Sequence, residues 1–152
     1  MNQTIPERGP RLSAETVHAS SVAIGGRAVL IAGPSGSGKS DLALRLLDRG
    51  FTLVSDDQTI VKKADNRLLA SSPPTVAGKL EIRGLGIVEV DRTDNVPVAL
   101  IVELTGDIQR MPDDSRERPI LGVKVPLVTI DAMTASAPSK VAIALDRMGL
   151  KF

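Results

Sequence analysis

Eight consecutive residues in the first third of the chain have the types and spacing of a phosphate-binding loop. They match the pattern G-x-x-x-x-G-K-[ST] and are Gly33, Pro34, Ser35, Gly36, Ser37, Gly38, Lys39 and Ser40. Glycines let successive backbone amides converge on phosphate oxygens, and the N-terminus of a following helix adds a positive dipole end. The pattern predicts that Lys39 reaches the β- and γ-phosphates of ATP and that the Ser40 hydroxyl binds Mg²⁺. A chance glycine-rich turn is the alternative.

Two adjacent carboxylates, Asp56 and Asp57, lie in an apolar strand pattern beyond this loop. Such a pair loses hydration in an apolar strand unless a positive group compensates it. If their strand adjoins the strand before the loop, its carboxyl end faces the γ-phosphate and its metal. One carboxylate would then lie near Mg²⁺ and the other would accept a proton from an attacking hydroxyl. The alternative is a capped turn in which both only accept backbone hydrogen bonds.

A third polar group is formed by Glu81 and Arg83, which the two-residue period of a strand places on one face. Gly84 and Gly86 would allow a bend after them. The plain alternative is a surface ion pair, which contributes little to stability. Spacing alone does not decide between a functional pair and a surface ion pair. His18, taken alone, is best explained as a structural residue of a strand.

The apolar patterns around these residues predict one α/β domain that positions them. Residues 17–24 and 27–32 flank a Gly-Gly pair that suits a tight hairpin turn. A helical pattern follows the loop over 39–49, and Gly50 would end it. The remaining expected elements are the strands 51–61, 67–70, 79–83, 86–90, 97–104 (apolar enough to be central) and 121–130, a polar loop over 105–119, and a closing helix over 138–148.

Composition excludes several classes of function. The chain has 152 residues and a net charge of +1, which gives no general attraction to nucleic acid or to an anionic membrane. It has no cysteine and one histidine, so disulfides, thiolate metal sites and multi-histidine zinc sites are excluded. Only two residues are aromatic, too few for a platform that stacks bases.

No segment has the pattern of an export signal or a membrane span. The longest apolar run, 28–32, is far shorter than the roughly 20 residues of a membrane-spanning helix. The first dozen residues are polar and contain two prolines, unlike a secretory signal. We therefore expect a cytoplasmic protein with a flexible tail over 1–14 and one domain over 15–152.

Together, His18, the loop 33–40, the run from Arg49-Gly50 to Asp57 and the segment 81–86 (EIRGLG) resemble the catalytic domain of HPr kinase/phosphorylase. That family phosphorylates a serine of HPr, the phosphocarrier of the sugar phosphotransferase system, and can reverse the step by phosphorolysis. The resemblance implies a mixed sheet like that of phosphoenolpyruvate carboxykinase, and a hexameric assembly. Family members usually carry an N-terminal domain as well, and we expect this chain to resemble the short form, known from alphaproteobacteria, that lacks it.

The resemblance also implies roles for single residues. Lys39 would grip phosphate, and Ser40 and Glu81 would bind the metal, with Asp57 as a further ligand. Asp57 would also be the proton acceptor in the kinase direction, with Asp56 beside it. His18 would lie near the phosphate that is transferred.

The arginines of the site are assigned in the same way. Arg83 belongs to the catalytic segment EIRGLG. Arg110 is the best candidate for a later active-site arginine of the family, and Arg116 and Arg118 are the substitutes.

One segment departs from the family pattern. Before the last helix the family has P-V-x-x-G-R-N, where this chain has ASAPSK over 135–140. An arginine holds phosphate through two parallel hydrogen bonds, whereas Lys140 is a point charge. We expect the phosphorylase direction, with inorganic phosphate or pyrophosphate as ligand, to be weakened or lost while kinase chemistry remains.

Two other functions are compatible with a phosphate loop. A small-molecule kinase would share the loop and the acids, but the segment 105–119 is too short for a separate lid domain. A non-enzymatic nucleotide-dependent regulator would bind ATP and HPr without turnover, and the intact Asp57 and Glu81 argue against it. The favoured partner is an HPr-like protein, with no nucleic acid and no membrane.

Overall fold

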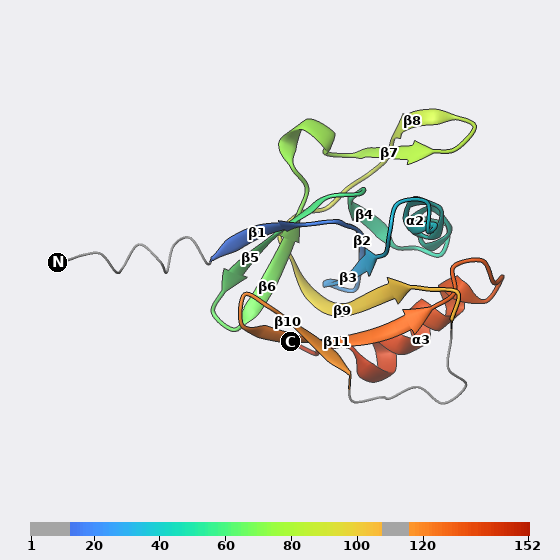
Figure 1. Ribbon diagram of the computed structural model, residues 1–152. Helices are drawn as coiled ribbons and strands as arrows, with labels where there is room; N and C mark the ends of the chain where they lie inside the picture. The colour runs from blue at the N-terminus through green and yellow to red at the C-terminus, as the bar shows by residue number, and fades with distance from the viewer. Residues whose placement is uncertain (1–12, 108–115) are drawn as a thin grey trace.

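The strands of this chain form a curled mixed sheet with two main helices on one face, in a computed structural model that describes residues 13–107 and 116–152 (Figure 1). In chain order the elements are β1 (Ala14–Val17), β2 (Ala19–Ile24), β3 (Arg27–Ala32), α2 (Lys39–Leu47), β4 (Thr52–Ser55), β5 (Thr59–Ala64), β6 (Arg67–Ser71), the 3₁₀ helix η1 (Pro74–Val76), β7 (Lys79–Ile82), β8 (Gly86–Glu89), β9 (Val96–Leu104), β10 (Glu117–Ile120), β11 (Val123–Ile130) and α3 (Ala137–Met148). The mixed α/β class is confirmed.

The order of strands in the sheet is β1-β5-β6-β9-β3-β2-β4, and β11 pairs with both β9 and β10. The pairs β3–β9 and β9–β11 are parallel, and the other pairs are antiparallel. β9 is central, as its nearly continuous apolar sequence predicts. The β2–β3 hairpin is also confirmed: its two turn residues, Gly25 and Gly26, both have positive φ, as a type I′ turn requires.

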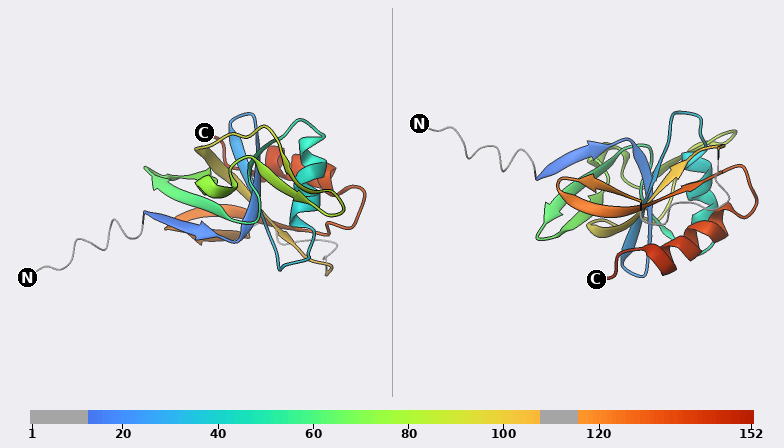
Figure 2. Two further views of the ribbon diagram at one scale, coloured as in Figure 1. Left: turned by 90° about the horizontal axis from the view of Figure 1, so that it is seen from above. Right: turned by 60° about the horizontal axis from the view of Figure 1, so that its bottom comes forward.

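The sheet carries a hydrophobic core on each face because side chains alternate along every strand. On one face, Val29 and Ile31 of β3 pack with Leu42 and Leu46 of α2 and with Val141 of α3. On the other face, neighbouring β3 residues pack with buried residues of β5, β6 and β11. Figure 2 shows α2 and α3 near one another on the first face.

The predicted glycine lies in the turn that ends helix α2. Gly50 has φ +94°, a conformation that glycine adopts without steric cost. The N–H of Phe51 donates to the Leu46 carbonyl, and the N–H of Gly50 donates to the Leu47 carbonyl. These two bonds form a Schellman motif, which satisfies carbonyls left open at the helix end.

One expected strand neighbour is wrong. The strand that carries the aspartates, β4, does not adjoin β3, because β2 lies between them and runs antiparallel to both. β3 and β4 still point the same way, so their carboxyl ends meet at one edge of the sheet. The expected strand 51–61 is also interrupted, by a turn at Asp56–Gln58 that separates β4 from β5.

Three other expectations need correction. Arg83 does not share a strand face with Glu81, because β7 ends at Ile82 and Arg83 lies in the turn to β8. The expected loop 105–119 ends early, since β10 begins at Glu117 and pairs with β11. β1 begins at Ala14, which pairs with Lys62, so the described chain is already a strand at the last residue of the expected tail.

The β7–β8 hairpin is a separate two-stranded sheet that lies over α2 on the side away from the main sheet (Figure 1). This position brings the EIRGLG segment to the same end of the molecule as the glycine-rich loop. Within the described ranges, no helix is long and apolar enough to cross a membrane.

Candidate active site

The glycine-rich loop joins the end of β3 to the start of α2, the expected strand–loop–helix arrangement. Gly36 and Gly38 have φ of +81° and +100°, a region that other residues rarely adopt. In the part of the chain that the structure describes, no side chain caps the start of α2, so the amides of its first turn stay available for an anion. The Ser37 hydroxyl is buried and has no hydrogen-bond partner among the described residues. These features fit a bound phosphate group.

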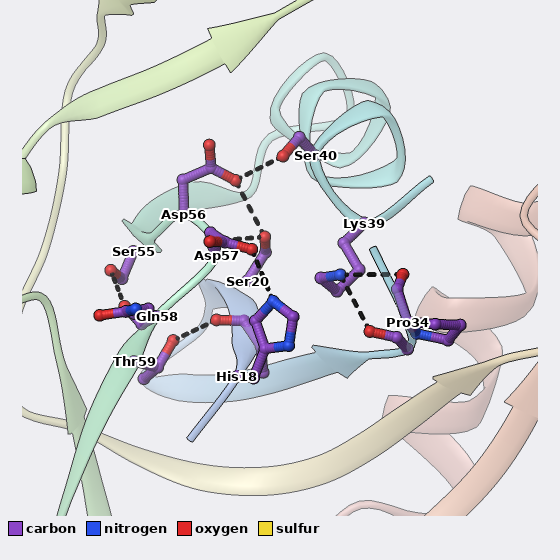
Figure 3. A network of polar contacts seen from close by, with 12 residues as sticks. His18, Ser20, Pro34, Lys39, Ser40, Ser55, Asp56, Asp57, Gln58 and Thr59 are labelled. Carbon is purple, nitrogen blue, oxygen red and sulfur yellow. Dashed lines mark hydrogen bonds and ion pairs between the residues drawn. The ribbon is translucent and has the colours of Figure 1, made fainter. Parts of the chain in front are cut away.

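Lys39 lies inside the curve of this loop and is only 6% exposed. Its Nζ donates to the carbonyl oxygens of Gly33 at 2.9 Å and Pro34 at 3.1 Å (Figure 3). An ammonium group has three donors. Two are taken by neutral carbonyls, so one donor and the full positive charge are available to a ligand.

The Asp56 carboxylate connects three elements. Its Oδ1 accepts hydrogen bonds from Ser40 Oγ at 2.6 Å and Ser20 Oγ at 2.9 Å. Its Oδ2 accepts the backbone N–H of Glu81 at 3.1 Å. Asp56 therefore joins the start of α2, the start of β2 and the β7–β8 hairpin, and its orientation is fixed from three sides.

Asp57 points to a different partner. It has φ +68°, and its Oδ1 lies 2.9 Å from His18 Nε2, as Figure 3 shows. The two side chains are 60% and 52% exposed, so the pair adds little to stability. Its other carboxylate oxygen has no hydrogen bond to any described residue, and an incoming molecule can reach it.

Among the described residues, the side chains of Glu81 and of the candidate arginines form no hydrogen bond or ion pair with Lys39 or with the two aspartates. Glu81 touches the site through its backbone, and its side chain is exposed, as is that of Arg83. Arg110 lies outside the described residues. Arg118 donates to Glu103 at 2.7 Å, and Arg116 lies 3.7 Å from the same carboxylate. Both substitutes for Arg110 are therefore already paired with an acid.

Oxygen ligands for a metal ion come from few residues. Within residues 13–107 and 116–152, no three His, Asp or Glu side chains lie close enough to form a metal site alone. Mg²⁺ commonly uses one or two protein oxygens and takes the rest from water and phosphate. The adjacent Ser40 and Asp56 oxygens fit that kind of site, which depends on a bound nucleotide.

A cavity of about 300 Å³ lies next to His18. Its lining includes Ala32 at the end of β3, apolar residues such as Ile101 and Ile120, and the charged side chains of Glu15 and Arg118. His18 thus contacts Asp57 and also borders this cavity, so the cavity adjoins the Asp57–His18 pair.

Arg45 is a residue of this region that sequence reasoning missed. It donates to the carbonyl oxygens of Thr134, at 3.2 Å, and of Ala132, and it pairs with Asp41 at 3.1 Å. A Cβ at Gly38 would lie 3.2 Å from the Cβ of Ala132. Arg45 thus holds the segment before α3 against the glycine-rich loop. The sequence indicates only its i, i+4 pairing with Asp41.

Replacing Arg45 with alanine should lower the free energy of unfolding by about 1–3 kcal/mol, because partly buried carbonyls lose their donor. Arg49→Ala is the matched control, since among the described residues its exposed guanidinium donates only to Ser139 Oγ. We expect that control to change stability by less than about 0.5 kcal/mol. Urea unfolding of both variants checks this, and equal stabilities would contradict the role of Arg45.

Comparison with known proteins agrees with this geometry. The family model described as the HPr Serine kinase C-terminal domain matches residues 11–147. A solved structure of the HPr(Ser) kinase/phosphatase from Coxiella burnetii superposes with a TM-score of 0.75 and 31% identity, over 87% of this chain and 94% of that chain. The fold is thus that of an HPr kinase catalytic domain.

Two curated relatives are both named HPr kinase/phosphorylase. The HPr kinase/phosphorylase of Clostridium tetani is 36% identical over 133 residues, which cover 79% of this chain and 44% of that protein. That of Prosthecochloris aestuarii is 38% identical over 126 residues, with coverage of 74% and 37%. The chain belongs to the HPr serine kinase C-terminal domain family, and it spans less than half the length of these curated relatives.

Proposed function

We propose that this domain transfers the γ-phosphate of ATP to a serine hydroxyl of an HPr-like protein. The observation that carries the proposal is that Lys39, the Ser40–Asp56 pair and the Asp57–His18 pair meet at one edge of the sheet (Figure 3). Family membership supports the kinase activity, and the names of the relatives support HPr as acceptor.

The glycine-rich loop and Lys39 bind the triphosphate. The uncapped start of α2, the unpartnered Ser37 hydroxyl and the free donor of Lys39 attract phosphate oxygens. Lys39 is buried among backbone dipoles, where its charge acts more strongly on a developing negative charge than it would in water.

The two carboxylates have different roles, metal binding for Asp56 and proton transfer for Asp57. Ser40 and Asp56 would hold Mg²⁺, which when bound neutralises charge on the β- and γ-phosphates. Asp57 accepts the proton of the attacking serine, and His18 fixes the orientation of its carboxylate. Because Asp56, and not Asp57, contacts Ser40, we propose Asp56 instead of Asp57 as a ligand of the metal ion. Glu81 remains a proposed ligand.

Release of ADP in the presence and absence of purified HPr tests the proposal. HPr should accelerate ADP formation, with one phosphoserine formed for each ADP. ADP formation that does not depend on HPr would contradict HPr as acceptor.

The cavity beside His18 favours a second candidate, phosphorylation of a small molecule. Its volume of about 300 Å³ suits a metabolite, and it borders the residue that contacts Asp57. The same ADP assay with a panel of hydroxylated metabolites separates the two functions, because only the true acceptor accelerates ADP release.

The reverse reaction should be slow in this protein. α3 begins at Ala137, and Lys140 on its first turn is exposed, where the family pattern expects an arginine nearby. A missing charge-assisted contact is worth about 1.5–3 kcal/mol, so phosphate-driven dephosphorylation of phospho-HPr should be roughly 10–100-fold slower than it would be with the arginine in place. Lys140→Arg should accelerate it, and rapid phosphorolysis by the wild type would contradict the prediction.

We retain three further expectations as proposals. Family resemblance supports a homo-oligomer, with six copies expected. The near-neutral charge and the site chemistry support a protein partner rather than nucleic acid or a membrane. A cytoplasmic location follows from the proposed partner.

A further inference from the structure

A buried serine on β2 contacts both members of the aspartate pair. The Ser20 hydroxyl donates to Asp56 Oδ1 at 2.9 Å and accepts the backbone N–H of Asp57 at 3.0 Å. Ser20 is fully buried. A serine hydroxyl has one donor and two acceptor lone pairs, and here it uses both functions on adjacent residues of another segment.

The sheet topology explains why a β2 residue reaches the aspartates. β2 lies between β3 and β4 and runs antiparallel to both, so its first residues lie where β3 ends before the loop and where β4 ends just before Asp56. Side chains alternate along β2. Ser20 faces the α2 side together with Val22, whereas the equally buried Ser21 faces the other side and bonds to Thr59 Oγ1 at 2.8 Å.

The aspartate turn needs such support because Asp57 has a left-handed backbone. A φ of +68° is unfavourable for a residue with a side chain and persists only where neighbouring groups hold it. Ser20 binds the Asp57 N–H, Gln58 N–H donates to the Asp56 carbonyl at 2.8 Å, and Ser55 Oγ donates to the Gln58 carbonyl. The turn directs the two carboxylates to different partners.

We propose that Ser20 is a positioning residue that holds Asp56 against Ser40 and Asp57 against His18 at the same time. The inference rests on the proposed function for the roles of the two carboxylates. Without the hydroxyl, Asp56 keeps two of its three donors, and the Asp57 N–H loses its acceptor. The turn can then relax, and a displacement of about 1 Å near reacting atoms can lower a rate about 100-fold.

Ser20→Ala with Ser21→Ala as matched control tests this role. Ser20→Ala should lower kcat for HPr phosphorylation roughly 10–100-fold, with KM for ATP nearly unchanged. It should also raise several-fold the Mg²⁺ concentration that half-saturates binding of a fluorescent ATP analogue. Ser21→Ala should change neither value, although both variants lose a buried hydrogen bond and should melt at a lower temperature than the wild type.

Ser20→Cys has the same shape with a slightly larger atom in place of the hydroxyl oxygen, and its thiol forms only weak hydrogen bonds. This variant decides the question if Ser20→Ala does not fold. Wild-type kcat and Mg²⁺ dependence in the Ser20 variants that fold would overturn the proposal, as would an equal loss in Ser21→Ala. If the wild type does not phosphorylate HPr, the proposed function fails, and the Mg²⁺ titration, which needs no turnover, still decides the role of Ser20.

Discussion

Lys39→Ala should abolish most phosphoryl transfer, with a fall in kcat of roughly 10²–10³-fold, the cost of removing one electrostatic donor from a catalytic site. The reason is that Lys39 is 6% exposed and directed into the glycine-rich loop, with one ammonium donor left for the triphosphate. Initial rates of HPr phosphorylation measure the loss, and ATP titration separates its effect on binding from its effect on the chemical step.

Lys39→Met is the volume-matched partner of this experiment. It keeps most of the aliphatic side chain in its buried position and removes only the charge and the donors. Because methionine cannot bond the Gly33 and Pro34 carbonyls, thermal melting should report any loss of loop structure. A folded Lys39→Met protein with more than half of the wild-type rate would contradict the role of the ammonium group.

Asp57→Asn should lower kcat roughly 10²–10⁴-fold, the typical contribution of general base catalysis, while ATP binding stays close to that of the wild type. Asparagine tolerates a left-handed backbone as well as aspartate does, so the turn should keep its shape. The side chain is 60% exposed, and stability should change by less than about 0.5 kcal/mol. Single-turnover kinetics, with this protein in excess over HPr and with saturating ATP, isolates the chemical step.

Asp56→Asn is the informative comparison for Asp57→Asn. Its carboxylate accepts from Ser40, Ser20 and the Glu81 backbone, so this variant should change the dependence of the rate on Mg²⁺ concentration. Asp57→Asn should leave that dependence unchanged. If both variants change it equally, the division of roles between the two carboxylates is wrong.

Local signals make the loop and its helix predictable from the sequence. The glycine-rich loop, α2 and its stop at Gly50 depend on residues that lie next to one another in the chain, and all three are present in the structure. The β2–β3 hairpin is predictable for the same reason, because its Gly-Gly turn sets the pairing.

The position of β2 between β3 and β4 is not predictable from local patterns. Strand order depends on contacts between distant segments, and periodicity states only that a segment is extended. As a consequence, the sequence presents Ser20 as an ordinary polar residue in an apolar strand. Nothing in the sequence shows that it forms hydrogen bonds with the aspartates. Two adjacent serines in a buried strand pattern were the available signal, since buried hydroxyls need partners.

The types of the residues at 56 and 57 predict the two roles of this aspartate pair, but not which aspartate has which role. Their chemistry predicts one carboxylate near the metal and one near the acceptor, but the choice depends on the backbone of one turn. In the turn after β4, where Asp57 has φ +68°, the Asp56 carboxylate lies at Ser40 and the Asp57 carboxylate lies at His18. The residue types alone contain no signal for that assignment, and only the family resemblance names Asp57 as the proton acceptor.

The intact mass of purified HPr, measured after incubation with this protein, ATP and Mg²⁺, tests the central proposal most directly. We predict that HPr gains the mass of one phosphoryl group, that fragmentation places it on a serine, and that Lys39→Ala phosphorylates only a small fraction of HPr in the same incubation time. An HPr of unchanged mass, with a wild-type protein that binds ATP and Mg²⁺, would contradict the assignment of this site as an HPr serine kinase.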